Sequence, residues 1–246
     1  QPVGVTNPYY AEFGWTPDPG VPAKVPGKDT PWTLASGDTL SPGKPVVLTW
    51  DNGEGLVFTR TVEVDENYMF TVKDAVENKG TTPAKLLPYG MIVRGGVPFF
   101  HKIWVVHQGM IGVMNGTLTE HDYDELADIE GNTAWQETTG GWLGFTDHYW
   151  MAALVPDQAE QVTASFRAPP QDGGRWTKYQ ADFLYKTARD IAPGGKAEVT
   201  HRLFAGAKVV SLLGDYQEKL GIERFDMAVD WGWFFFLTKP IFTVLH

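Results

Sequence analysis

The sequence predicts a mainly β protein: a large antiparallel β-sandwich with one or two α-helices at its C-terminal end. Short runs of alternating apolar and polar residues recur about every ten residues from Val46 onward. Turn-forming residues separate these runs, in a chain with 27 Gly and 17 Pro. Helical periodicity begins only after residue 206. More than ten strands indicate a sandwich larger than an immunoglobulin domain.

Length and charge exclude several classes of function. The chain has 246 residues, enough for one large domain or two small ones. It carries 20 basic and 30 acidic residues, a net charge of −10. This balance argues against a nucleic-acid partner and against electrostatic attachment to anionic lipid. Cysteine is absent, which excludes disulfides and thiolate metal sites.

Residues 1–45 are expected to form a Pro/Gly-rich linker or a strap over the domain surface. They hold nine of the seventeen prolines and show almost no periodicity. Proline removes a backbone donor and restricts its neighbour, so a regular element is not expected here. The chain begins with Gln rather than Met, and we expect further sequence upstream.

Residues 46–206 are expected to form the sandwich. Two alternating runs flank Asp51-Asn52-Gly53, a turn signal, and a further run follows near Tyr68 to Val72. The other predicted strands are Lys85–Arg94, Lys102–His107, Gly112–Leu118, Thr133–Glu137, Trp142–Thr146, His148–Val155, Gln161–Arg167, Arg175–Ala188 and Lys196–Ala205.

Residues 207–246 are expected to form the C-terminal helices. In Ala207–Leu220, apolar residues recur at steps of three and four, and Gly221 is placed to end this helix. In the final stretch, ten of the sixteen residues after Asp230 are Trp, Phe, Leu, Ile or Val. Asp230 is placed to cap a second helix and Pro240 to kink it.

The final helix has two interpretations that residue chemistry alone does not separate. It is too short to span a bilayer, which needs about 20 apolar residues, and too aromatic for a solvated surface helix. It suits either a helix lying in the membrane interface or a C-terminal helix packed into the core. On the first interpretation the membrane-interface residues are Trp231, Trp233, Phe234, Leu237, Lys239, Pro240 and Ile241.

Motifs for catalysis and cofactor binding were sought in the sequence. It contains no G-x-S-x-G, H-E-x-x-H or G-x-x-x-x-G-K-[ST] motif, and its six histidines are scattered. His101 and His107 do not have a metal-ligand spacing on one strand, so surface or hydrogen-bonded core histidines are expected. We therefore expect no catalytic, cofactor-binding or metal-binding residue.

The acidic run Glu120–Glu130 allows three interpretations. It lacks the central glycine and the third oxygen ligand of a calcium loop, so a calcium site is disfavoured. A solvated edge or short helical turn is the simplest interpretation. A docking surface for a partner protein is the third, because exposed charge sets the specificity and rate of association. Its candidate residues are Asp122, Asp124, Glu125 and Asp128.

Aromatic residues near the middle of the chain suggest a possible sugar-stacking platform. Trp142, Tyr149 and Trp150 lie within one short segment. The alternative is a strand pair whose large side chains fill the sandwich core, and this is the expectation that residue chemistry favours.

Several segments resemble the large periplasmic domain of the YidC-type membrane protein insertases, in the YidC/Oxa/Alb family. The final one is V-D-x-G-W-F-x-F-L-T-K-P, Val229 to Pro240. W-D-N-G-x-G-L-V-F-T-R, D-E-N-Y-M-F-T-V, H-Q-G-M-I-G-V-M-N-G-T-L and G-G-W-L-G-F-T-D-H-Y-W-M-A-A-L-V-P precede it, starting at Trp50, Asp65, His107 and Gly140. The matches run in order over about 200 residues, from Trp32 to the end.

This resemblance implies a β-supersandwich similar to galactose mutarotases, on the periplasmic face of a Gram-negative inner membrane. It implies that the intact protein inserts and folds nascent membrane proteins, alone or with the Sec translocon. The insertase groove lies among transmembrane helices outside this chain, so no catalytic residue carries over. Family partners include the SecD/SecF complex, for which we expect contact in the stretch before Gly140, and inner-membrane lipid at the C-terminal helix.

A carbohydrate-binding or mutarotase-like sandwich is the competing hypothesis. Similarity of fold does not transfer chemistry, and no motif marks the paired acid and base that a mutarotase needs. A soluble sugar-binding protein also has no need for an aromatic segment such as Trp231 to Leu245. That segment favours the insertase domain.

Overall fold

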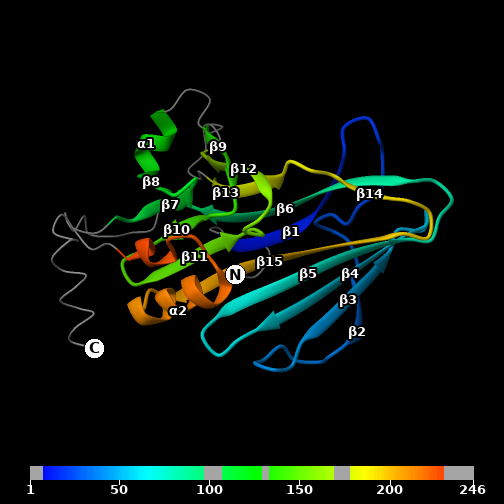
Figure 1. Cartoon of the computed structure of the whole chain (residues 1–246), viewed down its shortest axis with the longest axis horizontal. Helices are drawn as coiled ribbons and strands as arrows, with labels where there is room; N and C mark the ends of the chain where they lie inside the picture. Colours follow the sequence, from blue (N-terminus) through cyan, green and yellow to red (C-terminus); the bar gives the residue numbers. More distant parts are fainter. Residues whose placement is uncertain (1–7, 97–106, 129–132, 169–177, 230–246) are drawn as a thin grey trace.

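Two antiparallel β-sheets stacked face to face form the protein, as a computed structural model shows (Figure 1). The structure describes residues 8–96, 107–128, 133–168 and 178–229. Over these residues the prediction of a mainly β, antiparallel sandwich with few helices is confirmed.

The smaller sheet has six strands and contains the first strand of the chain. Its order is β1 (Tyr9–Pro17), β6 (Ala84–Gly95), β13 (Lys178–Tyr185), β12 (Gln161–Arg167) and β9 (Thr133–Thr139), and β14 (Arg189–Ile191) also pairs with β6. β1 pairs with β6 along its whole length, from Tyr9 opposite Arg94 to Pro17 opposite Leu86. This sheet therefore joins segments far apart in the sequence.

The larger sheet has nine strands. Its order is β2 (Thr33–Ser36), β3 (Val46–Asp51), β4 (Leu56–Val64), β5 (Met69–Asn78), β15 (Lys196–Ala207), β11 (Trp150–Val155), β10 (Trp142–Thr146), β7 (Gly109–Met114) and β8 (Thr117–His121). β15 pairs with β5 on one side and with β11 on the other. It is the strand that joins the two halves of the sheet.

The expectation of a linker over residues 1–45 is wrong for β1 and β2. Phe13 and Trp15 of β1 are buried, because this strand pairs with β6 at the edge of the six-stranded sheet and turns these side chains into the hydrophobic core. The prolines cluster after Pro17, where β1 ends. Between β1 and β2 the chain is tied to the residue that follows β3. Lys24 Nζ donates to Asn52 O and Asn52 Nδ2 donates to Lys24 O, both at 3.0 Å.

The predicted strand Gly112–Leu118 is a hairpin instead. β7 ends at Met114 and β8 begins at Thr117. Asn115 and Gly116 between them have φ values of 50° and 72°. Two consecutive residues with positive φ make the tight turn that asparagine and glycine favour, and this turn reverses the chain.

The main core lies between the two sheets and encloses one histidine. His201 of β15 is fully buried and stacks on Phe13, with ring centroids 5.2 Å apart. Phe183 and Tyr185 of the opposite sheet lie 5.5 and 5.6 Å from its ring. Burial, reinforced by Arg60 and Arg189, lowers the pKa of His201 to about 3, so the ring is neutral at pH 7.

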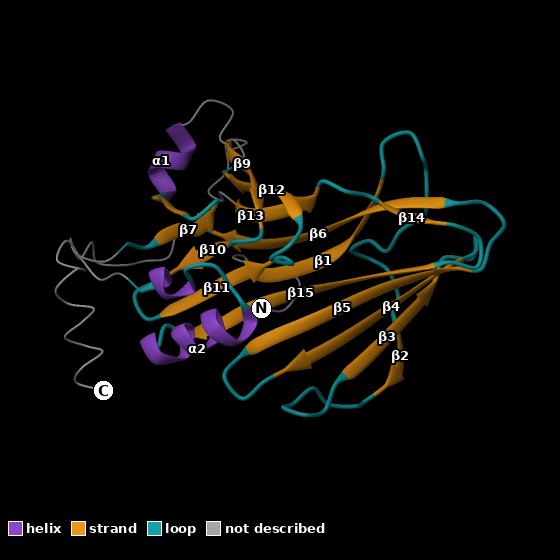
Figure 2. Cartoon of the chain, in the orientation of Figure 1, coloured by secondary structure: helices purple, strands orange, loops and turns teal. Residues whose placement is uncertain are grey.

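Helices gather at one end of the sandwich (Figure 2). They are α1 (Tyr123–Asp128), α2 (Val210–Leu220) and the 3₁₀ helix η2 (Phe225–Ala228). α2 begins three residues after its predicted start and ends as predicted, with Gly221 at φ 66°. The predicted final helix, which begins after Asp230, lies outside the described residues, and so does the predicted strand Lys102–His107 except for His107.

The buried His201 predicts a specific dependence of stability on pH. Its folded pKa lies below the unfolded value near 6.5, so between these values the unfolded chain binds more protons than the folded one. Stability from this group is present above pH 6.5 and is lost as the pH falls. From pH 7 to 4.5 we expect His201 to account for a loss of about 2 to 3 kcal/mol in unfolding free energy.

Urea denaturation at both pH values measures this loss. His201→Leu is expected to lose that much less than the unsubstituted chain, while Phe204→Leu, which alters a fully buried ring without removing an ionisable group, keeps the original pH dependence. Equal pH dependence in all three proteins would contradict the assignment.

Candidate functional site

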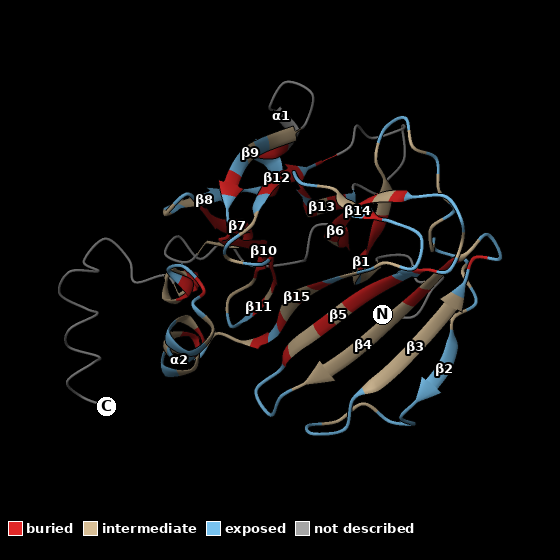
Figure 3. Ribbon diagram, turned by 45° about the vertical axis from the view of Figure 1, so that its right-hand side comes forward, coloured by how far each residue is buried: buried red, intermediate tan, exposed pale blue. Residues whose placement is uncertain are grey.

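The C-terminal helices pack on the outer face of the nine-stranded sheet (Figure 3). Phe225 of η2 is fully buried and lies 5.4 Å from Trp142 of β10 and 5.7 Å from Phe204 of β15, both edge to face. Leu213 and Tyr216 of α2 are buried in the same cluster. The amphipathic pattern of α2 is thus explained by a sheet face that it covers.

Hydrogen bonds fix the chain just before the predicted membrane-interface segment. Trp142 Nε1 donates to Glu223 O at 3.1 Å. Gln158 Oε1 accepts from the backbone N–H groups of Glu223 and Gly141, both at 3.2 Å. Arg224 Nη1 donates to Gly116 O in the β7–β8 turn. The path of the chain is therefore set by side-chain packing and by hydrogen bonds up to Val229.

The predicted membrane-interface residues lie outside the described residues. These are Trp231, Trp233, Phe234, Leu237, Lys239, Pro240 and Ile241. Their role stays a prediction. In the part of the chain that the structure describes, no helix is long and apolar enough to cross a membrane.

The acidic residues form a surface at α1. Asp122, Asp124 and Glu125 are exposed, and Asp128 is the last residue of the helix. The helix is held by Tyr123 and Leu126, which are buried against the main core. A short helix with two buried anchors and an exposed acidic side matches the expected solvated turn. The proposed docking role is compatible with it but untested.

Two histidines lie beside these carboxylates. His107 Nε2 donates to Met110 O at 2.9 Å, and its Nδ1 lies 3.4 Å from Asp122 Oδ1. His121 Nδ1 lies 3.5 Å from Glu125 Oε1. The two imidazole rings therefore border the acidic surface.

The possible sugar-stacking platform does not form. Trp142 is 1% exposed and belongs to the cluster under η2, whereas Tyr149 and Trp150 are 69% and 60% exposed. The three rings therefore do not share one surface. The favoured expectation, that these side chains fill the sandwich core, is also wrong for Tyr149 and Trp150, and Trp142 is buried in the outer cluster rather than between the sheets.

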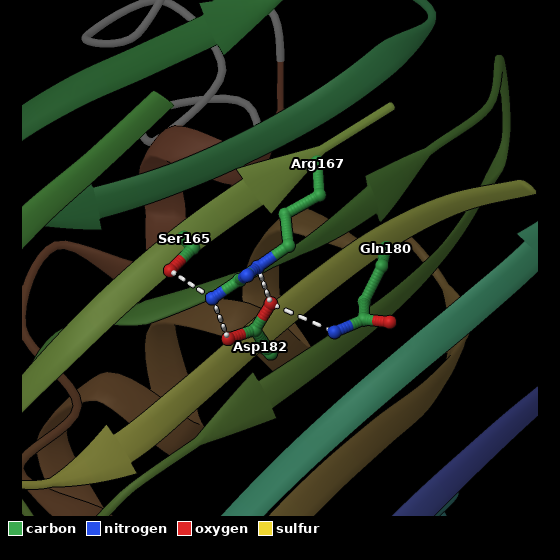
Figure 4. Close-up of polar contacts among 4 residues, drawn as sticks. All are labelled: Ser165, Arg167, Gln180 and Asp182. Carbon is green, nitrogen blue, oxygen red and sulfur yellow. Dashed lines mark hydrogen bonds and ion pairs between the residues drawn. The ribbon is translucent and has the colours of Figure 1, made fainter. Parts of the chain in front are cut away.

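A polar network occupies the outer face of the six-stranded sheet (Figure 4). Arg167 of β12 donates from Nε to Asp182 Oδ2 at 2.9 Å, and Gln180 donates to the same oxygen at 3.0 Å. Arg167 Nη2 also reaches Asp182 Oδ1 at 3.4 Å and Ser165 Oγ at 3.3 Å. Because Asp182 already receives these donors, the network serves to tie β12 to β13 rather than to present a free acid.

A groove of about 540 Å³ opens beside α2, on the outer face of the nine-stranded sheet. Its lining comes from β4, β5, β15, α2 and the residues before β3. The charged residues that line it are Lys44, Glu63, Asp65, Arg202 and Lys219, and the larger apolar ones are Val64, Met69, Tyr216 and Leu220. This volume lies in the range of small-molecule sites.

Tyr216 of α2 lines the groove and also packs in the apolar cluster that anchors this helix. Its ring lies 5.9 Å from Phe204, and its hydroxyl donates to Asp65 Oδ2 at 2.6 Å. Burial and this bond to a carboxylate raise the pKa of Tyr216, which keeps the hydroxyl a donor. The groove is not predictable from the sequence, because its residues come from four separate segments and a single arginine in a strand gives no local signal.

Metal ligation has no support among the described residues, where no group of three or more His, Asp or Glu side chains could hold an ion. His201, the most deeply buried histidine, lies between the sheets in an aromatic cage and does not reach the groove lining. The described surface offers a groove and charged patches as its candidate binding features.

Comparison with known proteins covers nearly the whole chain. The model of the YidC periplasmic domain family matches residues 1–244. The membrane protein insertase YidC of Methylobacterium sp. (strain 4-46) is 49% identical over 99% of this chain. That of Ruegeria pomeroyi is 45% identical over 100% of it. The chain spans 39% and 42% of these two relatives, about two fifths of their length.

A solved structure shares the fold. A galactose mutarotase related enzyme from Lactobacillus acidophilus superposes with a TM-score of 0.50 and 7% sequence identity, covering 72% of each chain. At this identity the likeness concerns the fold alone. The expectation of a mutarotase-like sandwich is confirmed, and no activity follows from it.

The packing of η2 predicts a large loss of stability on truncation of its central ring. Phe225→Ala removes a fully buried aromatic side chain, and we expect a decrease of about 3 to 5 kcal/mol in unfolding free energy. Trp150→Ala, at an exposed aromatic residue, is the matched control and should change it by about 0.5 kcal/mol or less. Urea unfolding followed by circular dichroism measures both. Similar losses in the two variants would contradict the docking described above.

Proposed function

Because the chain belongs to the family of YidC periplasmic domains, we propose that it is the large periplasmic domain of a membrane protein insertase. The match of the family model to residues 1–244 carries this proposal. The domain would lie on the periplasmic side of a Gram-negative inner membrane. There it would aid the insertion and folding of nascent membrane proteins, alone or with the Sec translocon, without turnover of its own.

The membrane-proximal role of residues 231–241 rests on their chemistry and on how the preceding residues are held. Phe225 and Glu223 are anchored to the sandwich, so the chain beyond Val229 starts from a fixed point. Trp favours the headgroup region of a bilayer, where its ring is buried and its indole N–H stays hydrated, and Phe adds apolar contact on the same face of an interfacial helix. With a net charge of −10, attachment would come from apolar contact.

The acidic surface at α1 is the proposed contact for the SecD/SecF complex. Its carboxylates at Asp122, Asp124 and Glu125 are exposed, just before and on a helix that buried Tyr123 and Leu126 hold in place. A rigid charged patch can steer a basic partner surface into register.

The alternative of a carbohydrate-binding sandwich is supported only by the shared fold.

Liposome flotation tests the membrane-proximal segment. We expect the full chain to float with vesicles at low and at high salt, because burial of each large apolar side chain contributes about 1.5 to 3 kcal/mol. A chain ending at Asp230 should remain at the bottom, as should a full-length variant with Trp233, Phe234, Leu237 and Ile241 changed to serine. If the full chain and the shortened one behave alike, the segment is not an interfacial anchor.

A chimeric insertase tests the domain's role and the acidic surface together. This chain would replace the matching segment of the Methylobacterium sp. insertase, and we expect the chimera to support growth of an insertase-depleted strain.

The same chimera tests the acidic surface. The D122N/D124N/E125Q variant should reduce co-purification of SecD/SecF several-fold, since it removes the steering charge. The control E77Q/D190N/E198Q removes three exposed carboxylates elsewhere. Equal loss in both variants would argue against docking at α1.

A further inference from the structure

Arg202 in the groove beside α2 differs from the other described arginines. Each of those has a polar partner within the protein. The pairs are Arg60 with Asp74, Arg94 with Asp147, Arg167 with Asp182, Arg189 with Glu160, and Arg224 with Gly116 O. Among the residues that the structure describes, Arg202 has no hydrogen-bond or ion-pair partner, although it is half-buried and lines the groove.

The two carboxylates of the groove are already occupied. Glu63 binds Lys73 Nζ at 2.8 Å. Asp65 accepts from Tyr216 through Oδ2, and its Oδ1 accepts from the backbone N–H groups of Asn67 and Met69, both at 2.9 Å. Neither carboxylate lies within ion-pair distance of Arg202. The guanidinium therefore faces the groove with its donors available.

Further cations surround the same space. Lys44 lines the groove beside Pro45, and Lys219 lines it from α2, where it pairs with Asp215 at 2.6 Å. Counting the lining residues and their ion-pair partners gives four cations, Lys44, Lys73, Arg202 and Lys219, against three anions, Glu63, Asp65 and Asp215. The groove is thus locally positive by one charge in a chain of net charge −10.

We propose that this groove binds a phosphate-bearing ligand, with Arg202 as its principal contact and Lys44 and Lys219 as flanking cations. A guanidinium presents a planar fork of donors that matches two phosphate oxygens, and it loses less hydration on binding than an ammonium. Met69 and Leu220 supply an apolar wall for an attached hydrocarbon portion. Both a phospholipid headgroup and free phosphate have this chemistry.

The site does not depend on the membrane-proximal segment. All of its residues lie between Ser41 and Leu220, before the first predicted interface residue. An anionic ligand in this groove would be held by electrostatic contact, although the net charge of −10 argues against such contact for the chain as a whole. Failure of the segment 231–241 to bind vesicles would leave the groove proposal unchanged. Failure of the groove to bind a phosphate ligand would likewise leave the proposal for that segment unchanged.

Calorimetric titration of the chain with soluble ligands tests the proposal. The probes are monomeric dihexanoyl-phosphatidylglycerol, inorganic phosphate and hexanoate, the last carrying a carboxylate on a similar hydrocarbon tail. Arg202→Gln should weaken binding of the phosphate ligands at least tenfold. Arg167→Gln removes an arginine from the opposite sheet and should leave binding unchanged. K44Q/K219Q should weaken binding less and reduce its salt dependence.

The three probes separate the possible ligands. Tighter Arg202-dependent binding of the lipid than of phosphate supports a headgroup site, and equal binding supports a site for free phosphate. Hexanoate binding as tight as the lipid would overturn the assignment to phosphate. No binding of either phosphate ligand, or equal binding by the Arg202 and Arg167 variants, would overturn the proposal as a whole. Unfolding midpoints of the variants confirm that each is folded.

Discussion

Packing of Phe225 against Trp142 and Phe204 is the contact on which the C-terminal part of the protein depends. It closes a cluster on the outer face of the nine-stranded sheet that would otherwise leave large apolar side chains in water. The Trp142–Glu223 hydrogen bond and the side chain of Gln158 then hold the adjacent backbone. The two sheets would form a complete fold without this cluster. Because the cluster holds Phe225 and the adjacent backbone against the sheet, the chain that follows leaves the sandwich at a defined place.

The outer face of the larger sheet is divided between two uses, and α2 lies at their border. Toward β7, β10 and β11 the face is apolar and covered, while toward β4 and β5 it is polar and open as the groove. Tyr216 belongs to both sides, because its ring packs on Phe204 and its hydroxyl holds Asp65. A shift of α2 would therefore alter the groove and the C-terminal anchor together.

Local patterns predicted much of the fold, and the failures have physical reasons. Alternation predicted β3 to β6 and β10 to β12, and three- and four-residue steps predicted α2 with its terminal Gly221. β1 is not predicted, because the prolines after Pro17 make residues 1–45 as a whole resemble an irregular segment. The β7–β8 hairpin is not predicted, because the expected strand Gly112–Leu118 runs through Asn115-Gly116, where the chain in fact turns. The groove could not be predicted, because Arg202 meets Lys44 and Lys219 only after four segments come together.

The position of β15 has a consequence for how the chain folds during its synthesis. β15 lies between β5 and β11, and it pairs Lys196 with Glu77, 119 positions earlier in the sequence. Such distant pairings are slow to form because a long loop must close first. Until residues 196–207 are available, the strand set β2 to β5 and the strand set β7, β8, β10 and β11 remain two separate ribbons with open edges. The larger sheet is therefore completed only when nearly all of the described chain has been synthesised.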